Sequence, residues 1–212
     1  DLIYAAGDAV QVKHYVTGDD ALISLAGPAN KQGRIIADNI CGGDSHYLGS
    51  QGSSVIKVFD MTAATTGINE TNAKKSGLEV DTVILSPMSH AGYYPGGKVM
   101  TMKVVFEKET YRLLGAQIIG YEGVDKRIDV LATAIHAGLK ATQLKDLDLA
   151  YAPPYSSAKD PVNMAGFMID NIAKGTLKQW HLEDMDKISK DKNVVLLDVR
   201  TVGEFNRGHM KE

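Results

Sequence analysis

Two loops place tyrosines among residues that turn the backbone. The first loop, "HAGYYPGG", holds Tyr93 and Tyr94, and the second, "YAPPYSSAKDP", holds Tyr151 and Tyr155. Glycine and proline let the chain turn so that a ring projects from a loop. A phenol can donate and accept hydrogen bonds, and its ring can shield a site from water. On the residue pattern alone, packing in a core or an interface explains such tyrosines more readily than chemistry does.

A carboxylate follows the first apolar run of the chain. Asp8 comes directly after Gly7 and the stretch "LIYAA", which we interpret as a buried strand over residues 2–6. An aspartate at the carboxyl edge of a sheet accepts hydrogen bonds from sugar or polyol hydroxyls. A turn or a helix cap is the simpler interpretation of the Gly-Asp dipeptide by itself.

The next candidate is a helix start in the stretch "LAGPA", which holds Leu25, Ala26 and Pro28. The free N–H groups and positive dipole end of a helix stabilise an anion or a polarised carbonyl. An order of strand, aspartate, loop and helix suits a cofactor that has both hydroxyls and an electron-poor ring. A helix packed only for stability remains the alternative.

The remaining polar residues give weaker signals. Cys41, outside any CxxC pattern, is interpreted as a small packed residue rather than a nucleophile. The six histidines show no metal-ligand spacing, so we predict no metal site. The charged stretch "DKRID" at residues 125–129 is interpreted as a solvated or subunit-facing helix start that forms ion pairs.

Composition and charge exclude several classes of protein. The 212 residues are 44% hydrophobic and 23% charged, with a net charge of -3. This charge gives no electrostatic argument for binding nucleic acid or an anionic membrane, and no apolar run is long enough to cross a bilayer. One cysteine excludes an intrachain disulfide, and a cytoplasmic location fits these features. Because the chain begins and ends inside predicted elements, we expect a fragment of a longer polypeptide.

The elements between these motifs predict an α+β fold. The clearest signal is an antiparallel hairpin, with strands on either side of the turn "KET". Helix signals with apolar stripes, caps and terminal glycines recur along the chain, with Asn69 and Asp160 as predicted caps. The apolar stripe predicted for residues 124–138 consists of Val124, Ile128, Leu131, Ala132 and Ile135. The predicted helices cover residues 26–40, 69–77, 124–138 and 161–175, and the predicted strands cover residues 2–6, 54–67, 80–87, 97–107, 111–122 and 193–200.

The motifs resemble a known family. "IYAAGDAV" and "LAGPANKQGRIIADNI" resemble the carboxyl-terminal end of the FAD domain in pyridine nucleotide-disulfide oxidoreductases. The resemblance implies that Gly7 and Asp8 hold the ribityl chain of the flavin. It also implies that Leu25, Ala26 and Pro28 face the flavin ring.

A second set of motifs narrows the resemblance. "GYYPGG", "GAQIIGYEGVDKRIDVLATAI" and "AYAPPYSSAKDPVNMAG" resemble the dimerisation domain of coenzyme A-disulfide reductases and their NADH oxidase and persulfide reductase relatives. This resemblance implies a homodimer in which Tyr93 and Tyr151 approach the redox cysteine and thiol substrate of the partner subunit. It assigns Tyr94 and Tyr155 to interface packing. A cation of residues 125–129 could meet a phosphate of coenzyme A, but an ion pair is the preferred interpretation.

The last residues resemble a third domain. "LLDVRTVGEFNRGH" at residues 196–209 is similar to the opening of a rhodanese domain, in which Asp198 and Arg200 have a structural role. The whole resemblance implies a two-layer dimerisation domain, with an antiparallel sheet and helices, preceded by the end of an FAD-binding α/β domain. The expected boundaries are residues 1–53 for the FAD-domain end, 54–175 for the dimerisation domain, 176–192 for a linker and 193–212 for the start of a rhodanese domain.

These parts predict a function for a larger protein. It would use NAD(P)H and FAD to reduce coenzyme A disulfide, a persulfide or a polysulfide. No GxGxxG motif follows a strand in this chain, so we expect the chain alone to be inactive and its two ends to be poorly ordered. A non-catalytic dimerisation module is the alternative from another class, and part of an NADH oxidase is the alternative among enzymes.

Overall fold

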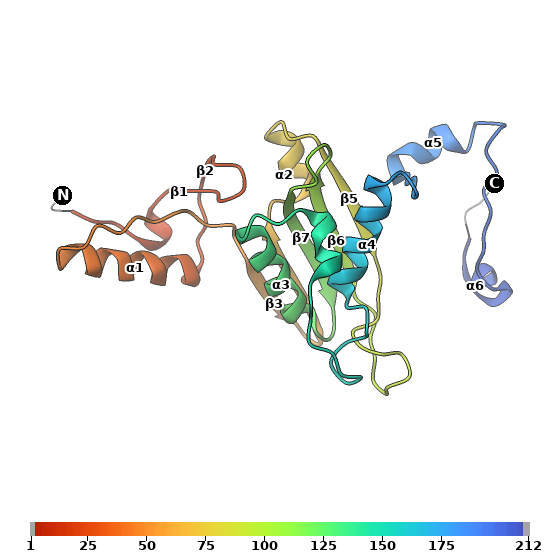
Figure 1. Ribbon diagram of the computed structural model, residues 1–212, viewed down its shortest axis with the longest axis horizontal. Helices are drawn as coiled ribbons and strands as arrows, with labels where there is room; N and C mark the ends of the chain where they lie inside the picture. Colours follow the sequence, from red (N-terminus) through yellow and green to blue (C-terminus); the bar gives the residue numbers. More distant parts are fainter. Residues whose placement is uncertain (1–2, 210–212) are drawn as a thin grey trace.

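The computed structural model describes residues 3–209, so parts of the predicted first strand and of the predicted rhodanese start lie outside the described residues. A five-stranded sheet lies at the centre, with one arm of the chain on each side (Figure 1). Within residues 3–209, no helix combines the length and the apolarity needed to cross a bilayer.

The central sheet is antiparallel throughout, in the order β3-β4-β7-β6-β5. Its strands are rich in valine, isoleucine and threonine, which suit a pleated surface. The strands are β3 (Ser54–Val58), β4 (Met61–Gly67), β5 (Val80–Leu85), β6 (Thr101–Glu107) and β7 (Leu113–Gly120). The predicted hairpin is confirmed as β6 and β7, and the antiparallel sheet with its helices confirms the predicted α+β class.

The predicted strand over residues 54–67 is wrong as a single element. It is a hairpin that turns between Val58 and Met61, which face each other across the two strands. Phe59 takes a φ of 51° and is almost fully exposed. The turn carries no glycine, proline or asparagine, and its single aspartate, Asp60, is a weak turn signal inside a run of strand-forming residues.

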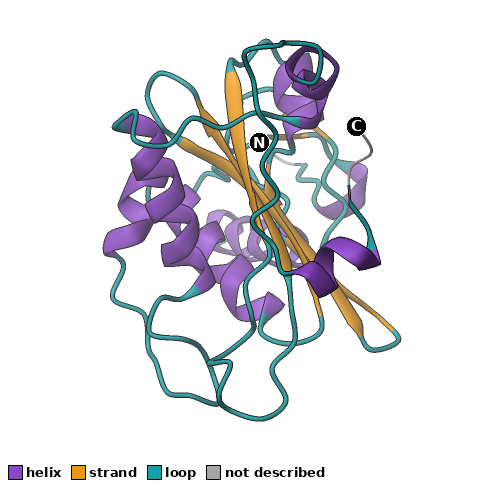
Figure 2. Ribbon diagram, turned by 90° about the vertical axis from the view of Figure 1, so that its right-hand side faces the viewer, coloured by secondary structure: helices purple, strands orange, loops and turns teal. Residues whose placement is uncertain are grey.

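Two helices cover one face of the sheet. They are α3 (Val124–His136), which packs on β4 and β7, and α4 (Pro161–Ala173), which packs on β5 and on the 3-10 helix η2 (Ala141–Asp146). Figure 2 shows the strands running diagonally, with helices on their left and further short helices on their right. The predicted apolar stripe of α3 is buried at Val124, Ile128, Leu131 and Ile135. Burial of this stripe is the main source of stability for a helix of this kind.

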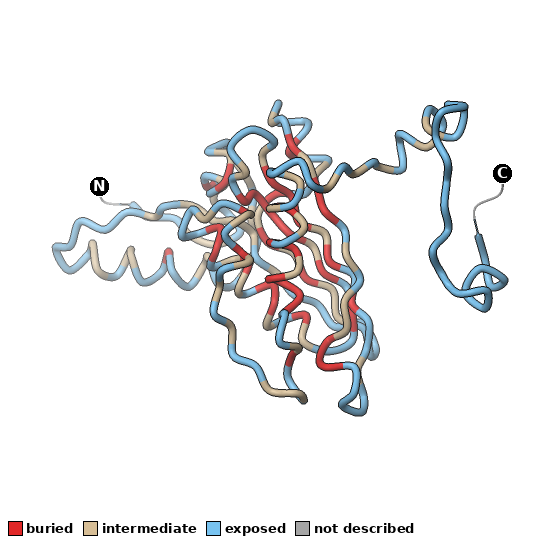
Figure 3. Tube along the Cα trace, turned by 45° about the vertical axis from the view of Figure 1, so that its right-hand side comes forward, coloured by how far each residue is buried: buried red, intermediate tan, exposed pale blue. Residues whose placement is uncertain are grey.

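The opposite face of the sheet is open. Met102 and Ile118 pair across β6 and β7 and are buried, whereas the next pair, Thr101 and Ile119, is exposed. This alternation follows the period of two in a strand. Figure 3 shows the buried residues concentrated in the sheet and the helices that cover it. At one end of the sheet, the short helix α2 (Glu70–Lys75) is capped by Asn69, whose side chain accepts a bond from the N–H of Asn72 at 2.8 Å, as predicted.

The amino-terminal arm is built around α1 (Ala26–Ile40), which confirms the predicted helix. The arm also holds the 3-10 helix η1 (Gly7–Ala9) and the strands β1 (Val12–Lys13) and β2 (Asp20–Ala21), which pair with each other. The strand predicted over residues 2–6 is wrong in its described part, because residues 3–6 pair with no strand within the described range. A strand exists through ladder hydrogen bonds to a neighbour, which an apolar sequence alone does not provide.

The carboxyl-terminal arm contains short helices and exposed apolar residues. The helices are η3 (Leu182–Asp184), α5 (Met185–Ile188) and α6 (Val202–Arg207). The strand predicted over residues 193–200 is wrong, since Val195, Leu197 and Val199 lie exposed in irregular backbone. Burial of an apolar run needs a second layer to pack against, and within residues 3–209 none covers this one.

Candidate functional site

The two tyrosine loops meet at their tips. The hydroxyl oxygens of Tyr93 and Tyr151 lie 2.8 Å apart, within hydrogen-bond distance. Both rings are accessible, with 76% of Tyr93 and 45% of Tyr151 exposed. In Figure 1 the two loops run side by side beyond one end of the sheet, between β5 and β6 and before α4. Two tyrosines that sequence reasoning placed in separate loops therefore form one surface feature.

The hydrogen bond between the two phenols changes the pKa of Tyr151. The hydrogen bond with Tyr93, followed by partial burial, raises the pKa of Tyr151 above its ordinary value of 10.0. Tyr151 therefore keeps its hydroxyl hydrogen at neutral pH. One hydroxyl hydrogen is used between the two oxygens, and the second remains free to be donated to a third atom. The pair can thus donate a hydrogen bond outward while each phenol is held by the other.

Backbone contacts join the two loops below the phenols. The N–H of Ala91 donates to the carbonyl of Ser156 at 2.9 Å, which links one loop directly to the other. Tyr94 packs edge-on against the buried ring of His90, with ring centroids 5.6 Å apart. The side chain of Tyr155 is exposed, and the predicted interface packing of Tyr94 and Tyr155 remains a prediction.

Arg127 lies beneath both loops and is 1% exposed. Its guanidinium forms an ion pair with Asp160, with a distance of 3.0 Å between Nη2 and Oδ2. It also donates to the carbonyl of Ser89 in the first loop at 2.9 Å and to Oγ of Ser156 in the second at 3.1 Å. The prediction of ion pairs in residues 125–129 is right for this residue, but the solvated or subunit-facing interpretation is wrong for it.

The site residue that sequence reasoning missed is therefore Arg127. Its partner Asp160 was predicted only as the cap of α4, which it also is, because its Oδ1 accepts from the N–H of Val162 at 3.0 Å. A usable signal was present in the helix pattern. Arg127 precedes Ile128 and lies three residues after Val124, so it falls at the border of the buried stripe.

The residues predicted to bind a flavin lie in a different region, around the start of α1. Gly7 takes a φ of 76°, and its N–H donates to Oε1 of Gln32 on α1 at 2.7 Å. Asp8 and Ala26 are exposed, while Pro28 is half-buried. In Figure 1 this region belongs to the amino-terminal arm, away from the two tyrosine loops.

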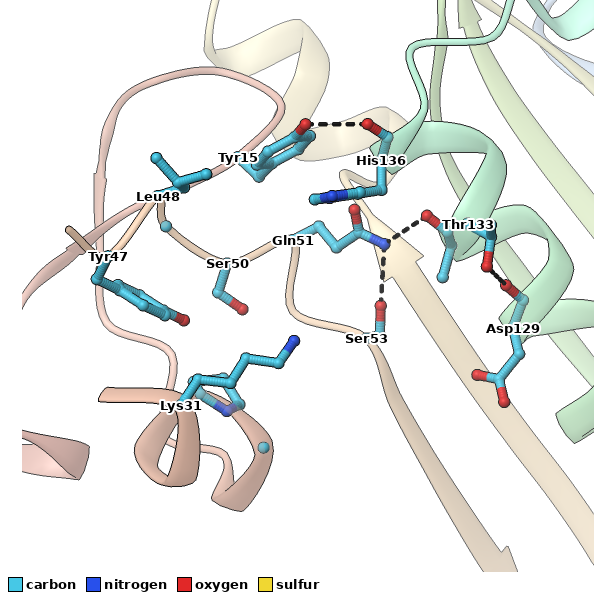
Figure 4. Close-up of a pocket in the computed structure, with 14 residues that line it drawn as sticks. Tyr15, Lys31, Tyr47, Leu48, Ser50, Gln51, Ser53, Asp129, Thr133 and His136 are labelled. Atoms are coloured by element: carbon cyan, nitrogen blue, oxygen red, sulfur yellow. Dashed lines mark hydrogen bonds between the residues drawn. The ribbon is translucent and has the colours of Figure 1, made fainter. Parts of the chain in front are cut away.

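A pocket of about 560 Å³ separates α1 from α3. Pro28 and Lys31 of α1 line one side, and Asp129 and His136 of α3 line the other (Figure 4). The remaining lining residues are Tyr15, Gly27, Tyr47, Leu48, Gly49, Ser50, Gln51, Ser53, Ala132 and Thr133. The pocket is therefore shared between the amino-terminal arm and the domain built on the five-stranded sheet.

Two side chains hold the arm to α3 at this pocket. Tyr15 stacks on His136, with ring centroids 5.0 Å apart, and donates from its hydroxyl to the carbonyl of His136 at 3.0 Å. Gln51 donates from Nε2 to the carbonyl of Ala132 at 2.9 Å and to Oγ1 of Thr66 at 3.1 Å. Figure 4 shows Lys31 extending from α1 into the space in front of Gln51.

Three other features of the sequence lie outside these two regions: Cys41, the possible metal ligands, and the pair Asp198 and Arg200. Cys41 is exposed at the end of α1, so the prediction that it is a packed residue is wrong. Within residues 3–209, no three or more His, Cys, Asp or Glu side chains are grouped closely enough to hold a metal ion. The carboxylate of Asp198 pairs with Arg200 at 2.6 Å, and this guanidinium lowers the pKa of Asp198 to about 2.

The fold and the joined loops define a known class of domain. Residues 53–161, just over half of the chain, match the family described as pyridine nucleotide-disulphide oxidoreductase, dimerisation domain. The chain therefore belongs to the pyridine nucleotide-disulphide oxidoreductase family.

Several proteins of this kind are similar to the chain. The crystal structure of reduced Bacillus anthracis CoADR-RHD has 48% identity and a TM-score of 0.93, and the match covers 98% of this chain and 37% of that one. The NAD(P)H sulfur oxidoreductase (CoA-dependent) of Pyrococcus abyssi is 39% identical over 76% of this chain and 36% of its own length. The coenzyme A disulfide reductase of Staphylococcus epidermidis is 37% identical over 78% and 37%, respectively. The chain thus spans little more than a third of the length of each relative.

Proposed function

We propose that this chain is a segment of an FAD-dependent NAD(P)H oxidoreductase that reduces coenzyme A disulfide, a persulfide or a polysulfide. The observation that carries the proposal is the hydrogen bond between Tyr93 and Tyr151, whose oxygens are 2.8 Å apart on two exposed loops. The similarity to a coenzyme A disulfide reductase and a CoA-dependent sulfur oxidoreductase supports the choice of substrate class.

The tyrosine pair would act on sulfur. When a disulfide or persulfide bond is reduced, one sulfur leaves as a thiolate, and a nearby hydrogen-bond donor lowers the energy of that charge. The pair offers one such donor, because only one of its two hydroxyl hydrogens is used internally. The free hydroxyl hydrogen of the pair would stabilise the thiolate by hydrogen bonding, without transfer of the proton.

The flavin would be held by the amino-terminal arm. The residues of the arm suit the groups of the flavin. Asp8 is an exposed carboxylate that can accept hydrogen bonds from hydroxyl groups, and α1 begins with the exposed residues Ala26 and Gly27. Pro28 stands at the wall of a pocket, and Leu25 is the residue before the helix begins. When bound, the flavin would supply the electrons that NAD(P)H delivers.

The tyrosines would serve the active site of a second copy. A dimerisation domain supports a homodimer, and the exposed loop tips lie apart from the flavin-binding arm of the same chain in Figure 1. This separation supports a site completed by two subunits. We further propose that residues 196–209 begin a rhodanese module that handles sulfane sulfur, with Asp198 and Arg200 as a structural pair.

Two measurements test this function. The first is a visible absorption spectrum of the purified protein, in which a flavin band is expected only when Asp8 and the start of α1 belong to an assembled cofactor site. The second uses the complete flavoenzyme that contains this chain, with coenzyme A disulfide as substrate. Tyr93→Phe and Tyr151→Phe should each lower kcat by about 100-fold, the usual range for loss of a hydrogen-bond donor to a developing charge. Unchanged kcat in both variants would reject the role of the pair.

A subunit-mixing experiment tests the shared site. Asp8→Ala should remove flavin from one subunit, and a Tyr93→Phe, Tyr151→Phe double variant should disable the other. If the tyrosines act in the partner's site, each mixed dimer regains one intact site, and about half of the wild-type activity per dimer returns. No recovery on mixing would place the tyrosines in the site of their own subunit.

A colourless, inactive protein favours the other candidate function, a non-catalytic dimerisation module. The open face of the sheet, with Ile56, Ile84 and Ile119 exposed, is the observation that supports this candidate. An NADH oxidase is the alternative within the enzyme class, and it would consume oxygen with NADH in place of a disulfide.

A further inference from the structure

The two phenols meet at the ends of loops that are far apart in the sequence. Tyr93 and Tyr151 are separated by 58 positions, and their only direct link is one hydrogen bond at an exposed surface. Water competes for exposed hydrogen bonds, so a single bond of this kind contributes little to the order of two loops. The relative position of the phenols must therefore be set below the surface.

The buried guanidinium of Arg127 contacts every element that carries the pair. Through Nη2 it donates to the carbonyl of Ser89 at 2.9 Å in the first loop. The same nitrogen donates to Oγ of Ser156 at 3.1 Å and to the carbonyl of Tyr155 at 3.3 Å in the second. Nη1 donates to the carbonyl of Gly123 at 3.1 Å, at the start of α3. One side chain thus joins both loops to the helix that packs on the sheet.

Asp160 completes this connection from the other side. Its Oδ2 accepts from Nε and Nη2 of Arg127 at 3.2 and 3.0 Å and from Oγ of Ser156 at 2.6 Å. Its Oδ1 caps the first turn of α4 through the N–H of Val162. Asp160 is 3% exposed, so the pair is shielded from solvent on both sides. The second loop is therefore fixed at its end by the start of α4.

The backbone is shaped around the guanidinium. Gly123 takes a φ of 68°, and a Cβ at this position would lie 2.0 Å from Nη1 of Arg127. Only glycine leaves room for the nitrogen there and also adopts this backbone conformation readily. The close approach is a second, independent sign that the site is built for a planar group with donors in several directions, which lysine does not provide.

We propose that Arg127 is a positioning residue for the tyrosine pair: its buried fork of N–H groups, held by Asp160, fixes the two loops so that the hydroxyls of Tyr93 and Tyr151 share a hydrogen bond. The catalytic meaning of this placement rests on the proposed function, but the placement itself does not. The side chain touches neither phenol, so it acts through the carbonyls of the loops.

The test uses the 212-residue chain with tyrosine labelled by ¹³C at Cζ. Tyr93→Phe and Tyr151→Phe assign the two signals, which are then followed by NMR as the pH rises. In the wild type, the signal of Tyr151 should titrate above 10.0, the ordinary value, because the hydrogen bond with Tyr93 raises its pKa. Arg127→Lys keeps the positive charge but lacks the planar guanidinium with its several N–H donors. In this variant the titration midpoint of Tyr151 should return toward 10.0.

Two further variants keep the result interpretable. Arg34→Lys alters an exposed Arg–Asp pair on α1, and it should leave both tyrosine signals unchanged. If Arg127→Lys does not fold, the double variant Arg127→Met, Asp160→Asn removes both buried charges together and keeps an acceptor for the cap of α4. This double variant should fold, as judged by circular dichroism. The titration midpoint of its Tyr151 should return toward 10.0, because the hydrogen bond with Tyr93 is lost.

These experiments give one result if the positioning role of Arg127 fails and a different result if the proposed function fails. A wild-type midpoint for Tyr151 in Arg127→Lys, or loss of the fold in both Arg127 variants, would overturn the positioning role. In the complete flavoenzyme, Arg127→Lys should lower kcat by about 10-fold to 100-fold with little change in KM, as expected for misplaced catalytic groups. If the two Tyr→Phe variants leave kcat unchanged while the NMR result holds, only the proposed function fails.

Discussion

The tyrosine loops and the amino-terminal arm are held to the sheet domain in opposite ways. The loops are fastened from below by Arg127 and Asp160, which are almost fully buried. The arm is fastened at its side by an exposed Tyr15 and a half-buried Gln51. Buried polar contacts are strong because the broken state leaves a desolvated group unpaired, whereas exposed contacts are replaced by water. We therefore expect the loops to be as stable as the core and the arm to open independently of it.

The largest expected effect comes from removing the buried cation. Arg127→Ala leaves the carboxylate of Asp160 buried without its partner and should lower the free energy of unfolding by about 3 to 5 kcal/mol. Urea denaturation followed by fluorescence of Trp180 and by circular dichroism measures this change. Arg34→Ala, which removes an exposed Arg–Asp pair, is the control and should cost less than about 1 kcal/mol. Equal losses in the two variants would contradict the comparison.

The second effect concerns the backbone under the guanidinium. Gly123 and Gly138 have nearly the same φ, 68° and 69°, but an added Cβ meets Nη1 of Arg127 only at Gly123 and finds open space at Gly138. Both alanine variants carry the strain of the left-handed conformation, about 1 kcal/mol. Gly123→Ala should lose about 2 kcal/mol more, because it displaces a buried ion pair. Thermal unfolding of the two variants measures this difference, and similar losses would show that the guanidinium moves aside freely.

The arm should respond locally rather than globally. Tyr15→Phe removes the hydroxyl that donates to the carbonyl of His136 and should change the global free energy of unfolding by only about 0.5 to 1 kcal/mol. Hydrogen exchange of the arm should nevertheless become faster, while β6 and β7 keep their protection, because local opening does not require the core to unfold. Faster exchange in the sheet as well would mean that the arm and the core unfold as one unit.

The smallest effect is a pH dependence at the sheet surface. Hydrogen bonds from Lys103, and then from Lys74, lower the pKa of Glu70 from 4.5 to about 2. A carboxylate with a lowered pKa contributes stability that is present above pH 4.5 and is lost as the pH falls toward 2. Because the group is partly exposed, we expect a contribution of only about 0.3 to 0.5 kcal/mol after screening. Glu70→Gln should flatten the stability curve between these pH values, and an unchanged slope would assign the acid loss to other carboxylates.

The sequence predicted the elements whose signals are local. Helix caps such as Asn69 and Asp160 satisfy N–H groups within two or three residues, so the short sequence around them carries the full signal. The β6–β7 hairpin was predictable for the same reason, because its turn and its strands are adjacent. The strands predicted near both ends were wrong because strand formation depends on a neighbour that may lie anywhere in the sequence.

The candidate site was only partly predictable. Tyr93 and Tyr151 were identified through resemblance, and their meeting at 2.8 Å follows from a three-dimensional path that no spacing in the sequence encodes. Arg127 was missed because a charged residue in a helix start is usually solvated. Its burial becomes understandable only from the structure, in which five residues supply acceptors to the guanidinium. The catalytic roles of the tyrosines, and the flavin contacts of Asp8 and Pro28, remain predictions.

The two edges of the sheet differ in protection against unwanted assembly. At β5, Nε2 of Gln179 donates to the carbonyl of Thr82 at 3.1 Å, and His181 contacts Asp81 at 2.8 Å, so the following segment occupies part of that edge. At β3, the other edge strand, Val55, Ile56 and Val58 are exposed, and Lys57 is the only charge between them. Exposed apolar edge strands pair with strands of other molecules, and lysine opposes this pairing. Aggregation of the folded protein would therefore begin at β3, and Lys57 is the residue that restrains it.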